Sequence, residues 1–260
     1  IHGNWLIEHA NDIVRNIKLA FKNKYHDEYA VQCPIIDIMN KKTLVHPLTI
    51  PEHDHATVIY NPLRTRDKNL VALAMVTSHL LSPLFFQEMR TNKQYGYLVG
   101  VGYVPINRYP GIAFYIQSPH TDAITLTKAI DDFINNSLDT LNDLSNDDWS
   151  HLIHGLAGQL QEKDNNLRIK SQRFWSAICN KDVHFTHKAQ LVESILSLKF
   201  QDVITFITKQ LRSIAIPDRV ILMSMPTEEP ALFQKIKHTL KNNINLVDTT
   251  AFTKKGRIKY

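Results

Sequence analysis

A long apolar segment that begins after Asp67 constrains the fold more than any other feature of this chain. Its hydrophobic side chains occupy nearly all sides of a helix, so the helix should lie deep in the protein against a sheet. They are Leu70, Val71, Leu73, Ala74, Val76, Leu80 and Leu81. A second apolar helical stretch at 82–89 leads into an apolar strand that begins at Tyr97. We therefore expect a sheet with helices packed on it.

Short runs of branched and apolar residues predict the strands of that sheet. They lie at 35–38, 44–48, 56–60, 97–104, 112–117 and 219–225. The strands at 97–104 and 112–117 are joined by residues 107–111, whose Asn, Pro and Gly suit the turn of an antiparallel hairpin.

Helical periodicity predicts a leading helix and a run of helices after the hairpin. The leading helix covers about 5–24, four further helices cover 122–141, 145–162, 167–180 and 199–212, and a short one starts near Ala231. Strands paired by turns and followed by helices predict the α+β class, with an antiparallel sheet and helices on one face. We expect a single domain over 1–245, with 1–24 as its leading helix and 246–260 as a basic tail.

Composition limits the classes of function. The 260 residues are 43% hydrophobic and 21% charged, which predicts a packed globular core. The net charge of +5 is scattered apart from the tail, so we expect no nucleic-acid partner. No apolar run reaches about 18 residues, so we expect no membrane span. Two lone cysteines, Cys33 and Cys179, exclude a disulfide scaffold and are expected to be buried thiols. The start at Ile1 reads as a chain entered in mid-protein, so a missing signal peptide says nothing about compartment.

The zinc-protease helix motif is absent in both orders. No His-Glu dipeptide occurs, which excludes His-Glu-x-x-His. Glu-His occurs at 8–9 and 52–53, but His-x-x-Glu-His would then need His where Trp5 and Thr49 stand. We therefore expect no metal site in this chain.

Other histidines allow a weaker metal hypothesis. The pairs His151/His154 and His184/His187 have chelating spacing, but neither has an obvious carboxylate partner. The segment 53–55, His-Asp-His, is most simply a solvated turn.

Glycines near the middle of the chain imitate part of a dinucleotide fingerprint. Gly96, Gly100 and Gly102 lie in or beside a predicted strand and not between a strand and a helix, which excludes that function. Glycine inside a strand instead indicates the close approach of another chain. A nucleophile elbow and a phosphate loop are also missing from the sequence.

The segment 90–97, Arg-Thr-Asn-Lys-Gln-Tyr-Gly-Tyr, carries the strongest functional signal. It places Arg90 and Tyr97 at a helix-to-strand corner, where side chains can face a cleft. Arg offers a permanently charged fork of donors, and the Tyr hydroxyl can donate to a developing oxyanion. The structural alternative is a salt-bridged corner with a packed Tyr.

This segment resembles the C-terminal half of the M16 metallopeptidases, the family of pitrilysin and insulin-degrading enzyme. The family carries an Arg-Thr-Lys-Glu-Gln-Leu-Gly-Tyr type segment at the end of a helix, and Arg90, Thr91, Gln94, Gly96 and Tyr97 match it. Further stretches resemble the family in the same order, at 2–4, 111–118, 173–178 and 198–206. The resemblance covers about residues 1–225.

The resemblance implies a fold and a function. The fold is the two-layer α+β domain of the M16 and LuxS-like metallohydrolases. Two halves of such a peptidase form a closed chamber, with zinc and the general base in the N-terminal half. Arg90 would bind a peptide carbonyl, and Tyr97 would act as catalytic donor to the substrate carbonyl or the oxyanion. Gln94 would help to hold the corner. The isolated chain would be inactive, with the N-terminal half and peptides as its partners.

Two other functions stay open. The chain could be a non-catalytic M16 homologue that serves as a binding or assembly subunit, or a free-standing peptide-binding module. By resemblance the compartment is periplasmic if the protein is a bacterial pitrilysin-like enzyme, with the cytoplasm as the alternative.

Overall fold

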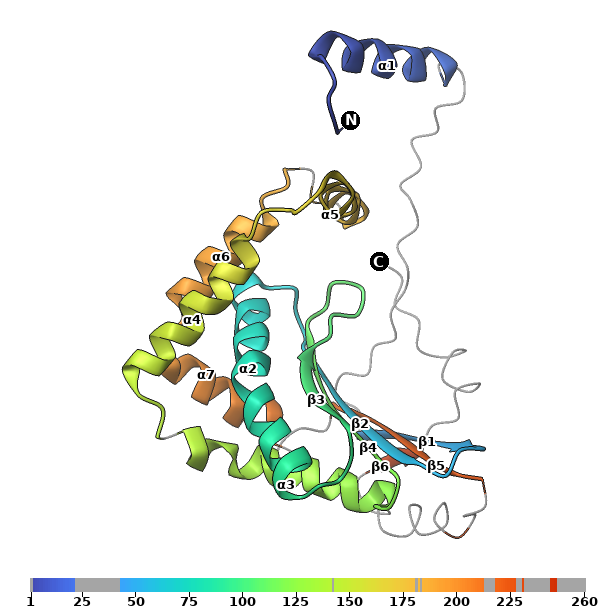
Figure 1. Ribbon diagram of the computed structural model, residues 1–260, viewed down its shortest axis with the longest axis vertical. Coiled ribbons are helices and arrows are strands. Elements are labelled where there is room, and N and C mark those ends of the chain that lie inside the picture. The colour runs from blue at the N-terminus through green and yellow to red at the C-terminus, as the bar shows by residue number, and fades with distance from the viewer. Residues whose placement is uncertain are drawn as a thin grey trace. The chain divides into compact units, whose positions relative to one another are not determined.

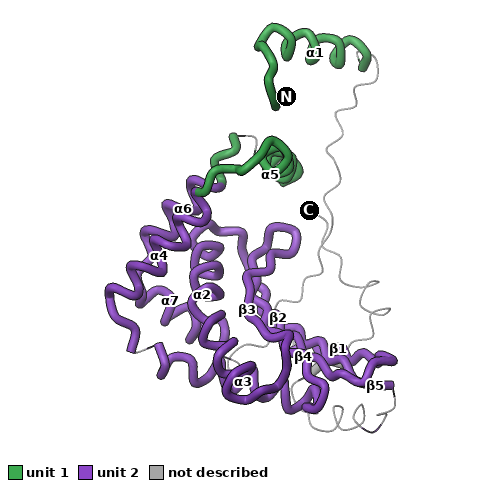
Figure 2. The backbone as a smooth tube through the Cα atoms, in the orientation of Figure 1, with its two compact units in different colours: residues 1–33, 162–187, 260 green, residues 34–161, 188–259 purple. Residues whose placement is uncertain are grey.

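The computed structural model describes residues 2–21, 43–141, 143–180, 182, 184–212, 218–227, 231 and 244–246. The chain folds into two compact units (Figure 2). Unit 1 comprises 1–33, 162–187 and 260, and unit 2 comprises 34–161 and 188–259. The predictions of a strand at 35–38, a helix after Ala231 and a tail at 246–260 fall almost entirely outside the described residues. The expected single domain over 1–245 stays a prediction.

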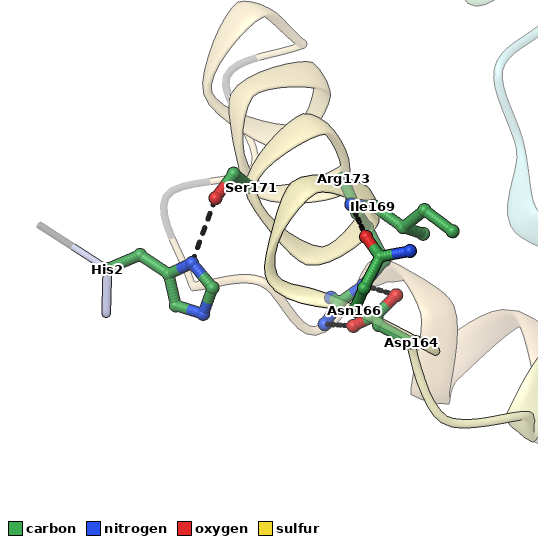
Figure 3. Close-up of polar contacts among 6 residues, drawn as sticks. All are labelled: His2, Asp164, Asn166, Ile169, Ser171 and Arg173. Atoms are coloured by element: carbon green, nitrogen blue, oxygen red, sulfur yellow. Dashed lines mark hydrogen bonds and ion pairs between the residues drawn. The ribbon is translucent and has the colours of Figure 1, made fainter. Parts of the chain in front are cut away.

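Unit 1 contains two helices, α1 (Ile7–Ala20) and α5 (Leu167–Cys179). The predicted leading helix is confirmed over α1, and none of its described side chains is buried. The start of the chain contacts α5, because the His2 ring meets Phe174 edge-on at 5.3 Å. His2 Nδ1 also lies 2.9 Å from the Ser171 hydroxyl (Figure 3). Two stretches that resemble the M16 family, 2–4 and 173–178, therefore meet in one unit.

Cys179 ends α5 and is exposed, so the expectation of a buried thiol is wrong for this cysteine. The reason is the helix itself, since none of the α5 side chains is buried among the described residues. Cys33 lies outside the described residues.

Unit 2 is built on a sheet and the helices that cover it (Figure 1). Its strands are β1 (Thr43–Ile50), β2 (His55–Pro62), β3 (Leu98–Tyr103), β4 (Gly111–Ser118), β5 (Val220–Pro226) and β6 (Ile244–Leu246). Its helices are α2 (Lys68–Phe86), η1 (Gln87–Asn92), α3 (Ala123–Leu141), α4 (Asn146–Gln161), α6 (His187–Ser197), α7 (Phe200–Phe206) and η2 (Ile207–Leu211). The α+β class is confirmed. Helix α6 and strand β6 were not predicted.

The apolar helix is α2, and it begins where the sequence indicated. The Asp67 carboxylate accepts from the backbone N–H groups of Asn69 and Leu70 at 3.0 and 3.1 Å, which caps the helix. The helix continues through Pro83 instead of breaking into two. Phe85 near its end is fully buried and packs edge-on against Phe114 of β4 at 5.6 Å. Hydrophobic burial along α2 thus fixes the position of its C-terminal end on the sheet.

The span Lys68–Asn92 is also long and apolar enough to cross a membrane by composition, because it contains an 18-residue window with a mean hydropathy of 1.5. Half of that apolar stretch is buried inside the protein. Packing on the sheet therefore explains why the helix is so apolar, as the sequence pattern predicted.

The sheet has the order β3-β4-β2-β5-β1-β6. The first four strands pair antiparallel, but β1 pairs parallel with both β5 and β6, so the expectation of a wholly antiparallel sheet is wrong in part. The cause is the position of β5 in the sheet. The short link 51–54 joins β1 to β2, yet β5 from the far end of the chain lies between them. Because β1 and β2 run in opposite directions, a strand antiparallel to β2 must be parallel to β1.

The helices of unit 2 gather on one face of the sheet (Figure 1). Strand β2 alternates buried and half-buried residues, and its buried Thr57 hydroxyl donates to the Ala123 carbonyl oxygen of α3 at 2.9 Å. The hairpin of β3 and β4 turns at Asn107 and Arg108, whose φ angles of 46° and 69° are both left-handed. Two positive φ angles in a row are the geometry of a type I′ turn, which suits the twist of a hairpin. The predicted hairpin is therefore confirmed.

Candidate functional site

The corner between α2 and β3 forms because the helix widens at its end. Residues 87–92 adopt a π-helical turn, η1, in which Lys93 N–H donates to the Glu88 carbonyl oxygen at 2.9 Å. The Tyr95 N–H then donates to the Met89 carbonyl oxygen at 3.0 Å. Met89 is fully buried and anchors the turn in the core. Single π-helical turns of this kind occur frequently at functional sites.

The structure brings Arg90 and Tyr97 together. The Arg90 guanidinium lies 5.3 Å from the centre of the Tyr97 ring, and its Nη1 is 3.4 Å from the Tyr97 carbonyl oxygen. It also lies 4.9 Å from the Phe86 ring, one turn earlier in the helix. Contact with aromatic faces holds a cation in place without neutralising it. None of the ion pairs among the described residues involves Arg90.

Tyr97 has 86% of its surface exposed, so its hydroxyl reaches solvent. The structural alternative of a salt-bridged corner with a packed Tyr is therefore wrong for Tyr97 and for Arg90, although Lys93 and Glu88 do form an ion pair at this corner. A retained positive charge next to a free phenol is what a site for a polar, electron-rich group requires.

Glu88 is held away from Arg90 by two other residues. Its carboxylate accepts from Asn92 Nδ2 at 2.8 Å and lies 3.3 Å from Lys93 Nζ. The Asn92 hydrogen bond is the main cause that lowers the pKa of Glu88, and Lys93 lowers it further. The nearest acid in the sequence is thus committed to Lys93 and Asn92, which leaves the Arg90 charge available.

Replacing Asn92 with Ala should raise the pKa of Glu88, because it removes the largest cause of the lowering. A lowered carboxyl pKa stabilises the fold above the ordinary value of 4.5, and this is lost as the pH falls through the folded-state pKa. Above pH 4.5 the free energy of unfolding of the variant should therefore be lower than that of the wild type. NMR titration of the Glu88 side chain measures the pKa directly, and an unchanged value in the variant would contradict this assignment.

Backbone geometry closes the corner between Arg90 and Tyr97. Gln94 has a left-handed φ of 53°, and its carbonyl oxygen lies 3.3 Å from His120 Nε2. Gly96 packs so tightly that a Cβ there would lie 1.9 Å from the Gln117 carbonyl oxygen. The described contact of Gln94 is through its backbone, so the suggestion that Gln94 holds the corner stays a prediction for its side chain.

The histidine alternatives gain no support from the described residues. No three His, Cys, Asp or Glu side chains gather there as a metal ion would need, so we derive no metal chemistry from this part of the chain. The interpretation of 53–55 as a solvated turn is wrong for His55, which begins β2 and is only 7% exposed. It is buried because alternate residues of β2 face the helices.

Two contributors to the corner were missed from the sequence. Phe86 stands four residues before Arg90, and that helical spacing predicts neighbouring side chains. Asn92 stands four residues after Glu88 in the same way. Both contacts could have been found by applying the spacing to the end of the apolar helix.

Comparison with known proteins agrees with this geometry. The profile of the family described as PQQ synthase PqqF-like, C-terminal lobe domain 4, matches residues 76–175, which include the whole corner. The A-factor-processing enzyme of Saccharomyces cerevisiae is 24% identical over 211 residues, covering 79% of this chain and 20% of that protein. A nardilysin-like protein of Arabidopsis thaliana is 29% identical over 121 residues, covering 46% of this chain and 12% of that protein.

The fold has a solved counterpart. A crystal structure of pitrilysin superposes with a TM-score of 0.81 at 15% identity, covering 99% of this chain and 27% of the pitrilysin chain. Residues 76–175 are thus similar to domain 4 of the C-terminal lobe of PqqF-like peptidases, and the chain has the fold of the corresponding part of pitrilysin. It spans a fifth or less of the length of the two relatives named above.

Proposed function

We propose that this chain is the C-terminal, zinc-free domain of a pitrilysin-like zinc endopeptidase. In this proposal it helps to form a closed chamber with an N-terminal half of the same polypeptide, and it binds and polarises the peptide substrate. The observation that carries the proposal is the pairing of an uncompensated Arg90 with an exposed Tyr97 at the end of α2. The zinc ion would be held by the other half.

The two side chains have different tasks. Arg90 can donate charged hydrogen bonds from its guanidinium to a peptide carbonyl oxygen and so fix the position of the peptide. Tyr97 can donate one hydrogen bond to the scissile carbonyl, which grows stronger as negative charge develops on that oxygen. Because Arg90 contacts the Tyr97 ring, the two donors reach the substrate from one side.

Arg90 variants of the full-length protein test this role. Arg90→Ala should raise KM for a peptide by roughly tenfold or more, because a charged hydrogen-bond donor contributes about 1.5–3 kcal/mol. Arg90→Lys keeps the charge but loses the planar fork, so it should recover only part of the loss. Steady-state kinetics of both variants measures KM and kcat separately. Wild-type values of KM and kcat in Arg90→Ala would overturn the role.

A second function, that of a non-catalytic binding or assembly subunit, would use the same corner. The two are separated by the polypeptide that precedes this domain, since a His-x-x-Glu-His segment there supports the enzyme. Compartment also stays a prediction. The relatives include a peroxisomal plant protein, and the structural neighbours include a periplasmic bacterial protease.

A further inference from the structure

Strand β3 lies at one edge of the six-stranded sheet, with β4 as its neighbour on the inner side (Figure 1). An edge strand directs alternate N–H and C=O groups away from the sheet. The hydrogen bond from Val104 N–H to the Gly111 carbonyl oxygen, at 2.8 Å, fixes which residues of β3 do so. It makes Val104 and Gly111 a hydrogen-bonded pair, and such pairs alternate along an antiparallel ladder.

Counting back from Val104, the residues at 102, 100 and 98 direct their backbone groups toward β4. Val99, Val101 and Tyr103 therefore direct theirs outward. None of the backbone hydrogen bonds among the described residues uses these outward groups. They span five residues, which at about 3.3 Å per residue is roughly 13 Å of edge from first to last.

This edge lacks the features that usually prevent another strand from pairing with it. Natural edge strands carry charged residues, Pro or bulges, whereas residues 98–103 read Leu-Val-Gly-Val-Gly-Tyr. Exposed apolar residues stand at both ends of the strand, with Leu98 at 56% and Val104, which directly follows Tyr103, at 41% exposure.

The two glycines of β3 differ in what lies beside them. A Cβ on Gly102 would have no neighbour within 4 Å, so that position faces open space. At Gly100 a Cβ would lie 2.4 Å from the Tyr115 hydroxyl, which means that the phenol of Tyr115 crosses over β3 toward the edge. Glycine in a strand commonly marks the close approach of another backbone.

We propose that the outer edge of β3 binds the substrate peptide as an added strand. This inference rests on the peptide-binding function proposed above and names how the peptide backbone is held. Tyr97 immediately precedes β3, so a peptide paired with Val99, Val101 and Tyr103 continues directly to the Arg90–Tyr97 corner. Main-chain pairing supplies affinity that does not depend on the peptide sequence. Alternate side chains of the peptide would contact the apolar residues beside β3.

Amide hydrogen exchange on this chain tests the pairing without requiring turnover. The probe is an eight-residue peptide of alternating valine and serine, blocked at both ends and N-methylated at every second residue. One of its edges can pair with β3, and the methylated edge cannot pair with another peptide. We expect the amides of Val99, Val101 and Tyr103 to slow by roughly tenfold or more at saturation, while those of Gly100 and Gly102 stay unchanged. The fully N-methylated peptide should protect none of them.

Val101→Pro provides a second measurement, because it removes an outward N–H that β4 does not use. It should weaken binding of the same probe by roughly tenfold or more. Ile153→Ala, which truncates a buried side chain of α4, should bind like the wild type. Protection of amides elsewhere but not on β3, or full binding by Val101→Pro, overturns the proposal. So does protection that depends on protein concentration without peptide, since it would mean that a second copy occupies the edge.

The two proposals fail in different experiments. If the β3 amides are protected but Arg90 and Tyr97 variants turn over normally, the edge binds peptides and the corner has no catalytic role. If the variants are impaired but β3 shows no protection, the corner functions and the added strand is wrong.

Discussion

Replacing Tyr97 with Phe in the full-length protein should lower kcat/KM for peptide hydrolysis by about 10²–10³-fold. The substitution removes one hydroxyl donor and nothing else. Because Tyr97 is 86% exposed, the loss should leave the stability of the domain unchanged. An effect on kcat larger than that on KM is expected, since the donor acts most strongly on charge that develops in the transition state.

Tyr95→Phe is the matched control for this variant. Tyr95 is two residues away, and its side chain packs partly buried against the core. It should therefore turn over like the wild type. Equal kinetics for Tyr97→Phe and Tyr95→Phe would remove Tyr97 from the mechanism, and an equal loss in both would indicate a general disturbance of the corner.

Replacing Gly96 with Ala should destabilise the domain by about 3 kcal/mol. The added Cβ would lie 1.9 Å from the Gln117 carbonyl oxygen, so the backbone of the corner or of β4 must move. Movement there shifts Tyr97, which is the next residue, and activity should fall together with stability. Urea unfolding of this chain measures the free energy of unfolding directly.

Gly102→Ala is the matched control, because its Cβ has no neighbour within 4 Å. Its free energy of unfolding should change by no more than about 0.5 kcal/mol. If Gly96→Ala proves as stable as Gly102→Ala, the close approach between the corner and β4 is not a structural requirement.

Local chemistry made much of the fold predictable. The start of α2 follows from the Asp67 cap, and the hairpin follows from a turn at Asn107 and Arg108, both of which depend on residues close in sequence. The parallel pairing of β1 was not predictable in this way. It depends on β5, which arrives from about 170 residues later and inserts beside β1.

The candidate site was also predictable only where it depends on residues close in sequence. Arg90 and Tyr97 were predicted from the corner and from the resemblance, and the structure places them in contact. The π-helical turn that orients them was not predicted, because it depends on how buried Met89 meets the core. The burial of His55 was missed for a similar reason, since its environment is set by helices that pack on β2 from elsewhere in the chain.

The central claim is that the Arg90–Tyr97 corner is half of an active site whose metal lies on another domain. Hydrolysis of a quenched fluorogenic peptide, measured for this chain alone and for the full-length protein, tests it most directly. We expect no hydrolysis by the chain alone, and hydrolysis by the full-length protein that a metal chelator abolishes. Zinc-dependent hydrolysis by the chain alone would contradict the claim.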